Sequence, residues 1–180
     1  MFSRNIYNYY YYNIVQFDLY LKCFCKNYME IVKLKQIILY FNFKNTNDSI
    51  SEKKKKLMCI FTSFLITNQF GKFISTQDIQ KNKNKTYNLV SYKISLRKNT
   101  MFLFISYLFT FLSPNTLNFK YLKNNKNTFT YNLNNLFLFP EIYLNIYNFV
   151  LIRNETLNIT FVTNSTNSSF LNLLISSFNI

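Results

Sequence analysis

The sequence predicts an α+β fold that combines a mostly antiparallel sheet with helices. Residues 90–97 alternate apolar and polar side chains, which is the two-residue period of a half-buried strand. Other stretches place apolar residues three and four positions apart, as amphipathic helices do. Strands and helices do not alternate regularly, which disfavours a parallel βαβ arrangement. The length predicts a single domain, residues 1–180.

The N-terminal part predicts a helix followed by a strand. We expect residues 1–10 to be a disordered extension and residues 10–30 to form the first helix. In that helix, Ile14, Phe17, Leu21 and Phe24 make one apolar stripe. Residues 36–44 predict a strand, because the residues at 37, 39, 41 and 43 are all apolar and fall on one face.

The middle of the chain predicts a second helix and a loop. The helix covers residues 52–68, with Ser51 as a candidate N-cap and Gly71 as a candidate end. Residues 77–88 are polar and lack apolar periodicity, so we expect an exposed, mobile loop. Three cations lie in it: Lys81, Lys83 and Lys85.

The strand at residues 90–97 is the clearest in the sequence, and it carries candidate binding residues. Its polar face presents two cations and two hydroxyls: Ser91, Lys93, Ser95 and Arg97. These groups are typical ligands of phosphate and ribose. By pattern alone, a half-buried strand with a solvated face explains them equally well.

The C-terminal half predicts two helices and three short strands. A helix capped by Asn99 or Thr100 covers residues 101–112 and ends before Pro114. Residues 118–135 are rich in Asn and Lys and predict a loop. The remaining elements are strands at 136–139, 147–152 and 157–162 and a terminal helix at 168–178.

Composition and charge indicate a polyanionic partner. Asn, Lys, Ile, Phe and Tyr have AT-rich codons, so their abundance reflects mutational pressure in an AT-rich genome. That pressure permits Asp and Glu as well, yet 21 Lys and Arg stand against 7 acids, a formal charge of +14. This excess favours nucleic acid, or less strongly an anionic membrane. A solvated basic surface without a partner is the remaining alternative.

The sequence offers little for catalysis or metal binding. It contains no His, and its acids make no obvious pair. Cys23, Cys25 and Cys59 are an odd number and fit neither a disulfide framework nor a zinc site. We therefore expect no enzyme, no cofactor and no metal. Residues 101–112 are too short an apolar run to span a membrane. The start lacks the Arg- and Ser-rich pattern of an import signal, which suggests synthesis inside an organelle.

Several motifs resemble the universal large-subunit ribosomal protein L-five family. The family's FPEI motif matches residues 139–142 here, and a strand ending in Thr and a closing helix follow it at 157–163 and 171–178. Residues 93–97, Lys-Ile-Ser-Leu-Arg, are similar to the family's Lys-Val-Thr-Leu-Arg strand. Pro114, Phe119 and Lys120 match another family segment, and Gln69 lies near its Gly-Gln-Lys-Pro turn. The resemblance covers nearly the whole chain.

The resemblance implies a divergent mitochondrial member that binds ribosomal RNA in the central protuberance. Helices would pack on one face of the sheet, and the other face would bind 5S ribosomal RNA, if the organelle has one, or large-subunit RNA. Neighbouring ribosomal proteins, the peptidyl-site tRNA and the small-subunit head are further implied partners. The implied RNA-binding residues are Gln69, Lys81, Lys83, Lys85, Ser91, Lys93, Ser95, Arg97 and Lys120.

The chain departs from the family at several positions. Nearly all of the family's glycines are replaced, and the segment after Pro114 has lost its arginines. Tyr40 replaces an Asn on a strand that touches RNA in the family. We therefore expect RNA contacts to be fewer or displaced. Two alternatives are a small basic membrane-associated protein that uses residues 101–112, and a functionless AT-rich reading frame.

Overall fold

The chain forms a six-stranded sheet whose strands follow the order β2-β3-β1-β6-β5-β4. The computed structural model describes residues 3–24, 26–44, 49–78, 87–108, 110, 121–124, 127–152, 155–165 and 173–174. All strand pairs between these residues are antiparallel. The strands are β1 (Leu34–Lys44), β2 (Lys72–Asp78), β3 (Tyr87–Leu96), β4 (Tyr121–Asn124), β5 (Thr128–Leu133) and β6 (Thr156–Thr163). The predicted α+β class with an antiparallel sheet is confirmed.

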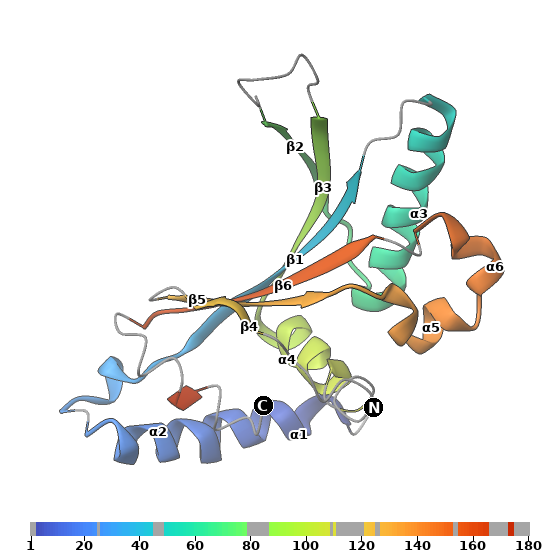
Figure 1. Cartoon of the computed structure of the whole chain (residues 1–180). Helices are drawn as coiled ribbons and strands as arrows, with labels where there is room; N and C mark the ends of the chain where they lie inside the picture. Colours follow the sequence, from blue (N-terminus) through green and yellow to red (C-terminus); the bar gives the residue numbers. More distant parts are fainter. Residues whose placement is uncertain are drawn as a thin grey trace.

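The helices lie along one side of this sheet (Figure 1). The longer ones are α1 (Ser3–Tyr10), α2 (Gln16–Lys22), α3 (Ser49–Thr67) and α4 (Lys98–Tyr107). The short ones are η1 (Tyr11–Val15), η2 (Tyr28–Glu30), η4 (Leu136–Leu138), α5 (Pro140–Tyr143), α6 (Ile146–Phe149) and η5 (Val150–Ile152). The core lies between the helices and the sheet, where alternate residues of the strands are buried.

The N-terminal helix differs from its prediction in extent and in orientation. Residues 3–10, expected to be a disordered extension, form α1, because its tyrosines Tyr7 and Tyr10 pack against the core. The helix continues through η1, a π-helical turn, into α2. Such a turn has about one more residue than an α-helical turn, so it rotates all later side chains around the axis. The expected stripe at Ile14, Phe17, Leu21 and Phe24 is exposed.

Predicted helix ends in the middle of the chain are also corrected. Helix α3 starts at Ser49, so Ser51 lies inside it and is not its cap. Its C-terminal end is at Asn68, which takes a left-handed backbone with φ of 53°, and not at Gly71. Asn adopts this conformation more readily than other side-chain-bearing residues. The helix α4 begins after Arg97, and the hydroxyl of Thr100 donates a 2.8 Å hydrogen bond to the Arg97 carbonyl.

The predicted loop at residues 118–135 contains the strands β4 and β5. In β5, Phe129, Tyr131 and Leu133 are buried and alternate with polar residues, a pattern that the many Asn and Thr residues disguise. The ring of Phe129 stacks on Phe161 of β6, with 4.4 Å between centroids. The predicted strands at 136–139 and 147–152 are wrong, because these residues form short helical turns. Only residues 173–174 of the predicted terminal helix are described, and they are helical.

Helix α4 supplies much of the core under the sheet. Four of its residues are buried: Met101, Phe102, Phe104 and Ile105. These four residues of the apolar segment therefore pack inside the protein. Across the described ranges, no helix combines the length and the hydropathy needed to cross a bilayer.

Candidate nucleic-acid interface

The alternation of the strands creates one open polar face on the sheet. In β1, Ile37, Leu39 and Phe41 are fully buried on the side of the helices. The residues between them point to the opposite side, which none of the described helices covers (Figure 1). The same alternation holds in β3, β5 and β6, where every second residue is buried. We call the uncovered side the open face.

A row of directly paired residues crosses five strands at the middle of the open face. From β2 to β5 its members are Lys72, Lys93, Tyr40, Asn158 and Asn132. Opposite residues in neighbouring strands have Cβ atoms about 5 Å apart, so each side chain lies beside the next. The ammonium of Lys93 lies over the Tyr40 ring, 5.7 Å from its centroid. We call these five residues the central row.

Two further rows on the open face are rich in hydroxyls and amides. Ser95, Ile38, Thr160 and Thr130 form the next row, in which the hydroxyls of Thr130 and Thr160 are 3.4 Å apart. Beyond it, Arg97, which directly follows β3, donates from Nε to the Oε1 of Gln36 in β1 across 3.0 Å. Among the described side chains of these rows, the cations Lys72, Lys93 and Arg97 lie toward β2 and β3, and the neutral polar groups lie toward β5 and β6.

The carboxylates with described side chains lie away from the open face. Asp18 pairs with Lys22 on α2 at 2.6 Å, and Glu155 accepts from Lys55 of α3 at 3.3 Å in a largely buried pair. Glu30 and Glu141 lie in helical turns. Among the described side chains, the cations of the open face therefore have no carboxylate partner.

Four of the nine residues predicted from sequence lie on this face. Lys93, Ser95 and Arg97 are accessible there, whereas Ser91 on the same side is only 8% exposed. Lys81, Lys83, Lys85 and Lys120 lie outside the described residues. Gln69 lies on the side of the helices, where it lines a pocket, so it does not join this face.

The sequence prediction missed the partners that β2, β1, β5 and β6 contribute to the face. They include Lys72, Gln36, Asn158 and Asn132. The alternation of polar and apolar residues at 156–163 is visible in the sequence and could have indicated Asn158. Predicting Lys72 would have required predicting β2. That strand is hard to identify in the sequence, because it follows a glycine and ends in polar residues.

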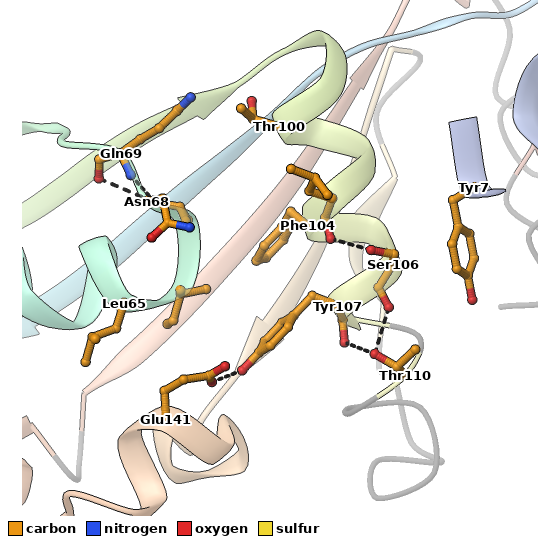
Figure 2. Close-up of a pocket in the computed structure, with 13 residues that line it drawn as sticks. Tyr7, Leu65, Asn68, Gln69, Thr100, Phe104, Ser106, Tyr107, Thr110 and Glu141 are labelled. Carbon is orange, nitrogen blue, oxygen red and sulfur yellow. Dashed lines mark hydrogen bonds between the residues drawn. The ribbon is translucent and has the colours of Figure 1, made fainter. Parts of the chain in front are cut away.

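The pocket that contains Gln69 is the second candidate site. It is a cavity of about 690 Å³ between α3, α4 and α5 (Figure 2). The hydroxyl of Tyr107 donates to the carboxylate of Glu141, and the Tyr107 ring stacks on Phe139. Burial, together with this bond to Glu141 and its negative charge, raises the pKa of Tyr107 well above its usual range.

The chemistry of this pocket is limited. Its walls hold one carboxylate, already bonded to a phenol, among apolar, hydroxyl and amide side chains. Within the described chain, no cluster of three His, Cys, Asp or Glu residues could hold a metal ion. The Tyr107–Glu141 contact is better explained as a link between α4 and α5 than as a reacting pair.

Comparison with known proteins adds no assignment. No model of a protein family matches the chain, and no curated protein matches it. The function therefore has to be argued from the open face itself.

Proposed function

We propose that this protein binds ribosomal RNA as a structural, non-catalytic component of the mitochondrial large ribosomal subunit. The observation that carries the proposal is the open face, on which cations, hydroxyls and amides from five strands lie together and which none of the described helices covers. Cations bind phosphates, and hydroxyls and amides bind riboses and base edges. The net charge of +14 adds a general attraction to a polyanion.

The proposed binding mechanism is electrostatic. Lys72, Lys93 and Arg97 neutralise phosphates and release the counterions condensed on the RNA. Because Lys72 and Lys93 are direct partners in neighbouring strands, their positive charges repel each other unless an anion lies between or above them. An RNA backbone along the β2–β3 side removes that repulsion.

The L-five-like place in the ribosome is supported by the sequence motifs and by the antiparallel sheet with helices on one side. In this proposal the chain lies in the central protuberance, against 5S or large-subunit RNA and neighbouring ribosomal proteins. Residues 139–142, the FPEI motif, have a structural role here, since Phe139 and Ile142 are buried where α5 begins. The other proposed partners, peptidyl-site tRNA and the small-subunit head, depend on this placement.

The test compares two variants with the same loss of charge. Replacing Lys93 and Arg97 with Ala should reduce the slope of log affinity against log salt by about 1–2 units, measured with structured RNA. The control replaces Lys53 and Lys54, which are exposed on α3 away from the open face. An equal reduction in both variants would show that net charge alone drives binding.

Cellular location is tested separately. After sucrose-gradient centrifugation of organelle lysate, the tagged chain should travel with the large ribosomal subunit. If it remains in the membrane pellet after carbonate extraction and is absent from the ribosomal fractions, the ribosomal proposal is wrong.

A further inference from the structure

Tyr40 occupies a position on the open face that electrostatics alone does not explain. It lies at the centre of the central row, between Lys93 of β3 and Asn158 of β6. Among the open-face residues whose side chains the structure describes, it is the one aromatic residue. Other strand aromatics, such as Phe41 and Phe129, are buried on the helical side. An aromatic ring placed among cations and amides offers a flat apolar surface at a polar interface.

The neighbour on β6 has an unfulfilled hydrogen-bonding group. The Oδ1 atom of Asn158 is buried and has no hydrogen-bond partner within the part of the chain that the structure describes. A buried acceptor without a donor is unfavourable, so a ligand that supplies an N–H or O–H group gains from meeting it. The amino groups of nucleobases are such donors. Because this oxygen is buried, a ligand reaches it only if the Asn158 amide rotates toward the open face.

We propose that Tyr40 is a stacking platform for an unpaired base of single-stranded or looped RNA. In this arrangement Lys93 leaves its position over the Tyr40 ring to bind the adjacent phosphate, and Asn158 faces the base edge. The inference rests on the proposed RNA-binding function and specifies its ligand. Bases inside an A-form duplex stack on each other, so their faces are covered. The Tyr40 ring can therefore stack only on the base of an unpaired nucleotide.

The first test measures affinity for a short single-stranded RNA and for a duplex of the same sequence. Tyr40→Leu should weaken binding of the single strand by roughly 5- to 100-fold, the effect of losing one stacked base. Tyr40→Phe keeps the ring and should retain affinity, and duplex affinity should not change in either variant. The salt slope should also stay the same, because no charge is altered.

The second test uses the absence of tryptophan from the sequence. Tyr40→Trp introduces a single reporter on the open face, whose emission a stacked base should quench. Single-stranded RNA should quench it, whereas the duplex should bind without quenching. This variant retains an aromatic ring, and its thermal unfolding compared with that of the parent chain verifies that it folds.

The results separate this inference from the proposed function. Unchanged affinity of Tyr40→Leu, or equal quenching by duplex and single strand, would overturn the stacking platform. If binding still depends on Lys93 and Arg97 in that case, the RNA-binding function stands. Loss of that dependence would instead reject the function and the platform together.

Discussion

Gly71 lies so close to the main-chain carbonyl of Lys93 that a Cβ atom added to it would be 2.3 Å from that oxygen. The same Cβ would be 2.7 Å from Cγ1 of Ile94. Gly71 is the single glycine in the sequence, and its N–H donates a 2.6 Å hydrogen bond to the hydroxyl of Tyr92. Its role is therefore steric: it lets the chain enter β2 against β3, which places Lys72 beside Lys93.

We expect Gly71→Ala to lower the free energy of unfolding by about 1–3 kcal/mol, because main-chain atoms have to move to admit the methyl group. Urea denaturation measures this, and RNA affinity should fall too, because β2 moves away from β3. Asn68→Gly is the matched control. Asn68 has a positive φ that glycine accepts freely, so its replacement should leave stability unchanged or slightly higher. Equal losses in both variants would contradict the steric explanation.

The helix that runs from α1 to α2 has apolar residues on both sides. Leu19 is fully buried, whereas Phe17 and Leu21 are 62% and 55% exposed. Leu19→Ala should lower the free energy of unfolding by about 2–5 kcal/mol, as for other buried leucines. Leu21→Ala should change it by less than about 0.5 kcal/mol. Chemical denaturation measures the unfolding free energy of both variants. A larger loss for Leu21→Ala than for Leu19→Ala would mean that the helix is rotated from the orientation described.

Stability at alkaline pH should depend on Cys59. Burial, and secondarily the negative charge of Glu155, raises the pKa of this thiol to about 12 from a usual 9.0. Between these values the unfolded chain loses the proton while the folded chain keeps it. The free energy of unfolding should therefore fall as pH rises from 9 to 12, by up to ~1.4 kcal/mol per pH unit from this group.

The measurement is denaturation of the parent chain and of Cys59→Ala at pH 8, 9, 10 and 11. The variant should lose stability less steeply above pH 9, although the raised pKa values of Tyr11 and Tyr107 leave part of the decline in place. If the free energy of unfolding falls equally with pH in the two proteins, folding does not raise the pKa of the Cys59 thiol.

The strands whose alternation is uninterrupted could be predicted from sequence. Residues 90–96 and 157–162 lie in β3 and β6, and residues 36–44 lie in β1; Arg97, predicted to belong to the strand, follows β3 directly. The predicted open-face residues Lys93, Ser95 and Arg97 follow directly from that period. The strand β5 has the same period, yet its polar positions are Thr and Asn, which are also typical of loops, and the surrounding Asn-rich sequence conceals it.

The sequence by itself determined the fold class and which residues of β1, β3 and β6 share a side, because a strand's alternation depends on local geometry alone. Tertiary structure decided which strands are neighbours, and thereby placed Lys72, Tyr40 and Asn158 in one row with Lys93. It also decided which side of the N-terminal helix is buried. Because apolar residues lie on both sides of that helix, their spacing in the sequence does not indicate which side is buried. The packing of α1 against α4 decides it.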